Sequence, residues 1–240
     1  MANSYFRFKQ FTVNQGQCAM KVCTDACVQG AFTASFLADR NITATAILDI
    51  GAGTGLLSLM LAQQMDAHIT AVELDPSAAG QARENFAASP WAHRLVLTEA
   101  DVRQLPADRK YDFIISNPPF YEASLKSGHA QKDQAMHATT LGYKELIAAV
   151  DRQLKEDGMF SILLPYPFFG ELTTLAAAAG YYPQEILYVK QSVKHGFFRA
   201  VGIFSKTFTE PHATELAIYD ENNVYTPPFT RLLQPYYLYL

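Results

Sequence analysis

Long apolar runs, paired cysteines and an excess of basic residues are all missing from this sequence of 240 residues. No apolar run approaches the roughly 20 residues that a helix needs to span a bilayer. The first residues, MANSYFRFKQF, lack the charged and then apolar form of a signal peptide. Three cysteines, an odd number, argue against a disulfide framework and in favour of a reducing compartment. These absences predict a soluble, cytoplasmic protein without membrane association.

The cysteines are also poor candidates for a metal site. Cys18, Cys23 and Cys27 contain no C-x-x-C pair, and no pair of histidines follows at ligand spacing. We therefore predict no metal and interpret these cysteines as small apolar residues near the start of a helix. The formal net charge of −4 gives no general attraction to nucleic acid, although binding needs only a local basic patch.

Short apolar runs alternate with helical patterns from about residue 45 onward. This alternation predicts an α/β fold with a doubly wound, mostly parallel sheet. The last two strands have no helix between them, which suggests an antiparallel edge strand. Gly158 and Gly180 are expected to end helices. Strands are expected at residues 45–50, 68–74, 94–100, 111–116, 159–165, 185–193 and 198–208, and helices at 56–65, 76–89, 143–155 and 168–180.

Residues 1–44 are set apart from this pattern and are expected to form an extension that packs on a core domain of residues 45–240. The stretch FRFKQFTV is interpreted as one arm of a hairpin, and TDACVQGAFTASFLAD as a helix capped by Thr24 or Asp25. The extension is too small to be an independent domain. The polar and then aromatic tail from Pro211 is expected to pack back onto the body.

The most informative stretch is LDIGAGTG, in which a predicted strand leads through three glycines into a helix. Gly51, Gly53 and Gly55 allow a tight turn and let the backbone come close to a ligand, with helix N–H groups pointing at it. We count Asp49 with them as a cofactor-binding residue. The pattern occurs in enzymes that bind dinucleotides and in methyltransferases that bind S-adenosylmethionine (SAM), and a bare packing turn is the alternative.

Acidic residues follow the next two predicted strands. Glu73 lies 22 residues after Gly51, where a carboxylate can accept from both hydroxyls of a ribose. Asp75 is interpreted as the possible cap of the following helix. Asp101 lies where its side chain could accept a hydrogen bond from the amino group of adenine. Together these carboxylates predict an adenosine pocket at the point where the strand order reverses.

The spacing of the glycines separates the two classes of cofactor. A dinucleotide fingerprint has a third glycine where this sequence has Leu56, whereas LDIGAGTG resembles the first motif of the class I SAM-dependent methyltransferases. The resemblance covers about residues 45–208. It implies a Rossmann-like, seven-stranded sheet with its last strand antiparallel, SAM as cofactor, the glycine loop under the methionine part of SAM, and Glu73 on its ribose.

A second motif, NPPF, follows the predicted strand at 111–116. In class I methyltransferases this position faces the methyl group, and [DNS]-P-P-[YF] is similar to the motif of enzymes that methylate amino or amide nitrogen. The resemblance implies that the side-chain oxygen of Asn117 and the carbonyl of Pro118 accept the two N–H hydrogens and aim the lone pair. Pro119 is counted with Asn117 and Pro118 among the catalytic residues, and Phe120 is expected to stack on the target ring.

Longer runs resemble the bacterial tRNA1(Val) adenine-N6-methyltransferases, which act on adenosine 37. These runs include AMKVCTD, LDIGAGTGLLSLMLAQ, DFIISNPPF and QPYYLYL, and they cover nearly the whole chain. The resemblance implies that Thr24 and Asp25 help to enclose SAM and that tRNA is the partner. A protein glutamine methyltransferase of the release-factor type and a guanine-N2 methyltransferase of ribosomal RNA remain alternatives. RNA contacts are expected from Lys21, Tyr121, Lys190, Lys194 and Arg199.

Overall fold

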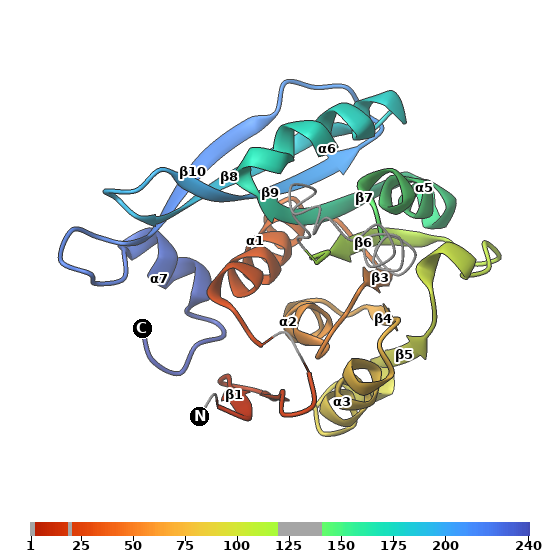
Figure 1. The fold of residues 1–240 in the computed structure, drawn as a ribbon, viewed down its shortest axis with the longest axis horizontal. Coiled ribbons are helices and arrows are strands. Elements are labelled where there is room, and N and C mark those ends of the chain that lie inside the picture. Colours follow the sequence, from red (N-terminus) through yellow and green to blue (C-terminus); the bar gives the residue numbers. More distant parts are fainter. Residues whose placement is uncertain (1–2, 19–20, 120–140) are drawn as a thin grey trace, which may run out of the picture.

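The computed structural model describes residues 3–18, 21–119 and 141–240. These residues form an eight-stranded sheet with helices on both faces and a separate two-stranded hairpin (Figure 1). Within these ranges, no helix is both long enough and apolar enough to cross a membrane. The sheet contains β3 (Ala46–Ile50), β4 (His68–Glu73), β5 (Leu95–Glu99), β6 (Tyr111–Ser116), β7 (Leu154–Pro165), β8 (Tyr182–Ser192), β9 (Phe197–Ser205) and β10 (His212–Tyr219).

The helices form two layers, each with its own apolar core. The helices of the first layer are α1 (Thr24–Asp39), α2 (Leu56–Gln64) and α3 (Pro76–Ala87), and those of the second are α5 (Tyr143–Gln153) and α6 (Tyr166–Ala178). The strand order is β10-β8-β9-β7-β6-β3-β4-β5. The chain thus runs outward from β3 in one direction and then from β6 in the other. This reversal confirms the doubly wound sheet and places a crevice at the carboxyl ends of β3 and β6.

The sheet has eight strands, so the prediction of seven was wrong. The additional strand, β10, pairs in parallel with β8. Its Leu216 and Ile218 are buried, and α7 (Pro227–Leu233) packs against it, which explains how a largely polar stretch becomes a strand. The antiparallel strand is β9, and it lies between β7 and β8 rather than at the edge.

The predicted role of Gly158 as the end of a helix was also wrong. Helix α5 ends at Gln153 and β7 begins at Leu154, so Gly158 lies inside the strand. A Cβ on Gly158 would lie 2.7 Å from side-chain carbons of Leu154 and 3.0 Å from the carbonyl oxygen of Asp112. Close packing therefore requires glycine here. Gly180, with φ of +82°, does follow the end of α6 as expected.

The N-terminal residues form the expected hairpin, but FRFKQFTV spans both of its arms, β1 (Tyr5–Arg7) and β2 (Thr12–Asn14). The side chain of Asn85 in α3 holds the hairpin by bonding both the N–H and the carbonyl of Asn14, each at 2.9 Å. Cys23 precedes α1 and no side chain caps this helix, so the predicted caps Thr24 and Asp25 were wrong.

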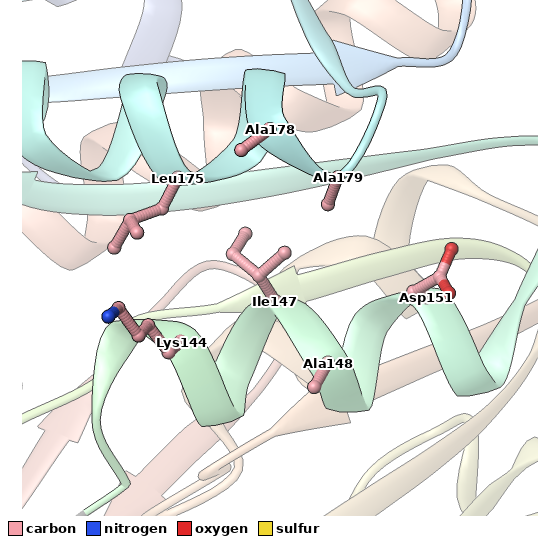
Figure 2. Close-up of a pocket in the computed structure, with 7 residues that line it drawn as sticks. All are labelled: Lys144, Ile147, Ala148, Asp151, Leu175, Ala178 and Ala179. Carbon is pink, nitrogen blue, oxygen red and sulfur yellow. The ribbon is translucent and has the colours of Figure 1, made fainter.

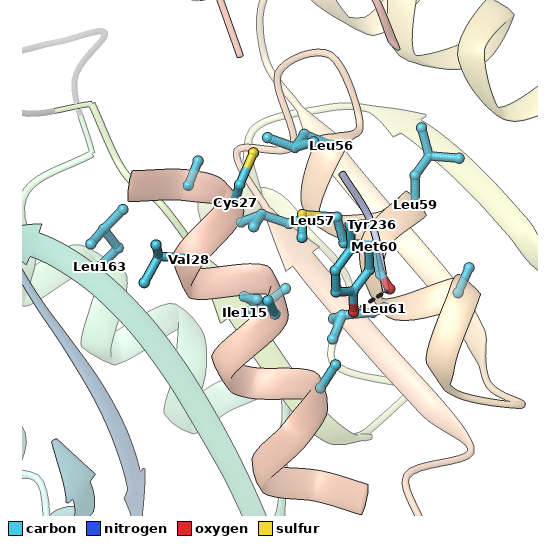
Figure 3. Close-up of a cluster of buried hydrophobic side chains, with 14 of the residues drawn as sticks. Cys27, Val28, Leu56, Leu57, Leu59, Met60, Leu61, Ile115, Leu163 and Tyr236 are labelled. Atoms are coloured by element: carbon cyan, nitrogen blue, oxygen red, sulfur yellow. Dashed lines mark hydrogen bonds between the residues drawn. The ribbon is translucent and has the colours of Figure 1, made fainter. Parts of the chain in front are cut away.

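The aromatic tail packs back onto the body, as expected. Tyr236 is buried, and its hydroxyl donates to the carbonyl of Met60 at 3.3 Å (Figure 3). Figure 3 shows this side chain in the same cluster as Cys27 of α1 and Leu57 of α2. Burial raises the pKa of the Cys27 thiol to about 12, so this thiol is a neutral apolar group in the core.

Candidate functional site

The glycine loop leaves the carboxyl end of β3, and its three glycines have positive φ angles of +71°, +56° and +81°. A Cβ on Gly51 or Gly53 would meet nothing within 4 Å, whereas one on Gly55 would lie 2.4 Å from the ring of Phe86. The first two glycines therefore face open space where a ligand can approach the backbone, and the third lets α3 pack closely. This difference fits the ligand loop that the sequence predicts.

The carboxylate of Glu73, at the end of β4, is held against this loop. It accepts from the backbone N–H of Gly53 at 2.8 Å and from that of Asp75 at 2.8 Å. Asp75 itself caps α3 by accepting from the N–H of Ala78 at 2.8 Å, which confirms its interpretation as a helix cap. The structure thus brings Glu73 and the glycine loop together.

Asp49 lies in β3, two residues before Gly51, and is completely buried. Its Oδ2 accepts from the N–H and the hydroxyl of Ser58, at 3.1 and 2.7 Å, while its Oδ1 has no partner among the described residues. Burial raises the pKa of Asp49 to about 7, and the nearby charge of Glu73 acts in the same direction. Ser58 was not predicted, although a hydroxyl within the apolar run LLSLML was a signal for it.

Asp101 lies just beyond β5 and begins a short 3₁₀ turn, Val102–Gln104. The guanidinium of Arg103 bonds both of its carboxylate oxygens, with 2.6 Å from Nη2 to Oδ2. These bonds lower the pKa of Asp101, so the group is an ionised acceptor. Arg103 also bonds Glu145 of α5 at 3.2 Å. Arg103 was not predicted, although the D-x-R spacing was the available signal.

Asn117 comes directly after β6, and its side-chain Oδ1 is buried with no hydrogen-bond partner among the described residues. Leaving such an oxygen unpaired costs about 1–3 kcal/mol, so a donor from a ligand would be stabilising. Pro118 is buried and Pro119 is exposed. The predicted Phe120 and Tyr121 lie outside the described residues.

A buried side-chain amide that was not predicted contacts the residue before Asn117. Gln29 of α1 donates from Nε2 to the carbonyl of Ser116 at 2.9 Å. Its only signal in the sequence is a polar residue inside the apolar run ACVQGAF.

The predicted basic residues fall into two groups. Arg199 of β9 bonds Asp25 of α1, with 2.7 Å from Nε to Oδ2, and Lys21 donates to the carbonyl of Cys18 at 2.9 Å. Arg199 and Lys21 therefore both contact residues of the N-terminal part of the chain. Lys190 and Lys194 belong to the other group, at the connection from β8 to β9.

Thr24, at the start of α1, lies within hydrogen-bonding distance of Tyr237. Burial raises the pKa of Tyr237, and the bond from Thr24 opposes this shift. Thr24 and Asp25 thus belong to a part of α1 that contacts both the C-terminal tail and β9.

Two other features of the described residues are separate from this site. No group of three or more His, Cys, Asp or Glu side chains in the described ranges could hold a metal ion. A shallow pocket lies between α5 and α6 (Figure 2), and no predicted site residue lines it. Its lining residues are Lys144, Ile147, Ala148, Asp151, Leu175, Ala178 and Ala179.

Comparisons with known proteins find that this chain is similar to methyltransferases. The family model described as "Methyltransferase small domain" matches residues 30–181. A tRNA1(Val) (adenine(37)-N6)-methyltransferase of Dyadobacter fermentans is 43% identical over 98% of each chain. Another of that name, from Klebsiella pneumoniae, is 38% identical over 98% of this chain and 95% of the relative.

Solved structures show the same fold. A structure described as a predicted O-methyltransferase of Agrobacterium tumefaciens has a TM-score of 0.66 at 18% identity and covers 88% of this chain and 96% of its own. The glycopeptide N-methyltransferase MtfA, solved with SAM, has a TM-score of 0.54 at 13% identity. The match covers 74% of this chain and 94% of the MtfA chain. These likenesses establish the class I methyltransferase fold.

Proposed function

Since this chain belongs to the family of the tRNA1(Val) (adenine(37)-N6)-methyltransferases, we propose that it transfers the methyl group of SAM to N6 of an adenine in tRNA. Adenosine 37 of tRNA1(Val) is the position that the relatives' name specifies. A tRNA substrate also supports the expectation of a cytoplasmic protein.

One observation supports this proposal most directly. Ile50 and Ser116 are paired residues in adjacent strands, and the Ser116 hydroxyl donates to the Ile50 carbonyl at 2.9 Å. Gly51 follows the first of these residues and Asn117 the second. The glycine loop and the unpaired amide oxygen of Asn117 therefore begin side by side at one edge of the sheet, as a site that holds a cofactor against an amine requires.

The residues around the loop fit SAM. Open space lies over Gly51 and Gly53, and the carboxylates of Glu73 and Asp101 are acceptors at the ends of neighbouring strands. We propose that these residues, with Asp49, Gly55, Thr24, Asp25 and Asn117, hold the cofactor. When bound, SAM supplies an electrophilic methyl group.

The amine of adenine is a poor nucleophile because its lone pair is delocalised into the ring. In this proposal, Asn117 Oδ1 accepts one N–H and the Pro118 carbonyl accepts the other. Both bonds pull the nitrogen toward tetrahedral geometry and localise its lone pair. No strong base is required, because the proton leaves to water once the nitrogen has become cationic. Phe120 is proposed to stack on the base.

Cations near the site are proposed to hold the RNA backbone. They are Lys21, Lys190, Lys194 and Arg199, with Tyr121 as an aromatic contact. Methylation of a base inside a loop requires that base to leave its stack, and phosphates beside it then need nearby positive charge. Lys194 lies in an exposed turn, and Lys190 is part-exposed beside Glu215, with 2.6 Å between Nζ and Oε2.

The test incubates purified protein with labelled SAM and, in separate reactions, unmodified bacterial tRNA, ribosomal RNA or release factor. We expect N6-methyladenosine in digested tRNA. Asn117→Ala should lower kcat roughly 10²-fold or more, because its contacts strengthen in the transition state, and should lower SAM affinity far less. Asn222→Ala, at an exposed asparagine, is the matched control.

Each contrary outcome has a distinct meaning. Label in the release factor and none in tRNA would move the reaction to a glutamine amide. Methylated guanine in ribosomal RNA would change the target base. Full activity of Asn117→Ala on tRNA would remove Asn117 from the catalytic site while leaving the substrate assignment intact.

A further inference from the structure

Three aromatic rings meet at the start of α6. The ring centroids of Tyr166 and Tyr188 are 5.6 Å apart, those of Tyr166 and Phe197 are 5.2 Å apart, and those of Tyr188 and Phe197 are 5.1 Å apart. The ammonium of Lys190 lies 4.6 Å from the centroid of the Phe197 ring. We call these four residues the aromatic patch.

The aromatic patch lies at the carboxyl ends of the parallel strands, as Asn117 does. Tyr166 directly follows Pro165, the last residue of β7, and β7 is the neighbour of β6, whose last residue precedes Asn117. Because β9 is antiparallel, its first residue, Phe197, also lies at this edge. No predicted role accounts for Tyr166, Tyr188 or Phe197.

The patch is built to present one ring to solvent. Tyr166 is 42% exposed, whereas Tyr188 and Phe197, whose rings contact it, are half-buried. Contact with two other rings limits the rotamers of Tyr166, so little side-chain entropy remains to be lost when a ligand stacks on it. A fixed aromatic face beside a lysine is the combination that single-stranded nucleic acid requires.

We propose that Tyr166 stacks on an unpaired nucleotide next to the target adenine in the RNA, and that Lys190 and Lys194 face the phosphate of that nucleotide. This inference rests on the proposed function and names a contact for the same substrate. When the target base leaves its stack, its neighbours lose a stacking partner. The aromatic patch replaces that partner, and so offsets part of the cost of extruding the base.

The test compares three variants of the full chain with tRNA as substrate. Tyr166→Leu should raise KM for tRNA on the order of 5- to 50-fold, because stacking on a base is lost. Tyr166→Phe keeps the ring and should behave as the unaltered protein. Phe208→Leu is the matched control, since Phe208 is 79% exposed but follows β9 at the opposite edge of the sheet. SAM affinity should be equal in all three.

A second measurement locates the nucleotide. Irradiating the complex of protein and tRNA with ultraviolet light should join the peptide that contains Tyr166 to a nucleotide adjacent to the methylated adenine, and Tyr166→Leu should abolish that product. If the protein methylates tRNA but Tyr166→Leu leaves KM and the cross-link unchanged, the stacking contact is wrong and the proposed function stands. If the protein neither binds nor methylates tRNA, both are wrong.

Discussion

The side-chain amide of Gln29 donates to the main-chain carbonyl of Ser116, with 2.9 Å between Nε2 and the oxygen. Gln29 is completely buried in α1, and Ser116 is the last residue of β6. The carbonyl belongs to the peptide bond that leads into Asn117. The helix therefore fixes the orientation of the peptide from which the proposed catalytic amide projects.

This bond makes Gln29 a positioning residue, and we expect Gln29→Met to lower kcat on the order of 10- to 100-fold with little change in SAM affinity. Gln153→Met is the control, because Gln153 is equally buried and its amide also donates to main-chain carbonyls, those of Leu105 and Pro106. Both variants should lose similar stability, about 1–3 kcal/mol. Equal loss of kcat in the two would show that Gln29 acts only through stability.

The buried Asp49 predicts a stability that depends on pH. Its pKa is raised from 3.8 to about 7, so the folded protein binds more protons than the unfolded chain between those values. The stability associated with this group is complete below the unfolded pKa and is lost as pH rises through about 7. The free energy of unfolding should fall by at most about 1.4 kcal/mol for each pH unit in that window.

Urea unfolding at pH 5 and pH 8 measures this slope. Asp49→Asn should flatten it, since the amide oxygen can still accept from Ser58 without carrying a charge. Asp66→Asn, at a fully exposed side chain, should leave it unchanged. A slope that persists in Asp49→Asn would assign the pH dependence to other groups.

The glycine loop predicts that two alanine substitutions fail for different reasons. Gly55→Ala brings a Cβ to 2.4 Å from Phe86 at a φ of +81°, so it should lose more than the roughly 1–2 kcal/mol of the backbone conformation alone. Gly53 also has a positive φ, but its Cβ position meets nothing within 4 Å. Gly53→Ala should therefore lose less stability than Gly55→Ala and more SAM affinity.

Thermal unfolding and SAM titration of both variants measure this contrast. Gly170→Ala is the control, because no neighbour lies within 4 Å of its Cβ position in α6 and alanine favours a helix. A larger loss of SAM affinity in Gly55→Ala than in Gly53→Ala would contradict the open face of the loop.

The parallel sheet and the glycine loop were predictable because their signals are local. Apolar runs bounded by turns mark the strands, and the acids at the strand ends follow from the same pattern. Strand β10 was missed because a strand at the sheet edge needs few buried residues, and only Leu216 and Ile218 of its eight residues are fully buried. Gly158 was wrongly predicted because the sequence alone does not distinguish a glycine that ends a helix from one that is needed for close packing, here against Leu154.

The partners of the site residues were not predictable from the sequence. Gln29 and Ser116 are 87 residues apart, and Asp25 and Arg199 are 174 apart. Such contacts depend on how helices lie against the sheet, which no local pattern encodes. The strand ends predict which residues gather at an edge, while the packing decides which hydrogen bonds they make.

The contact between the hairpin and the aromatic tail has a consequence for the order of assembly during synthesis. The backbone N–H of Lys9 bonds the carbonyl of Tyr236, and Phe8 pairs with Tyr237. The hairpin residues must therefore wait for tail residues that are synthesised much later. The glycine loop can form before the tail is synthesised, but the hairpin beside α3 gains these contacts only after Tyr236 and Tyr237 have been made, so the contact between hairpin and tail forms later than the loop.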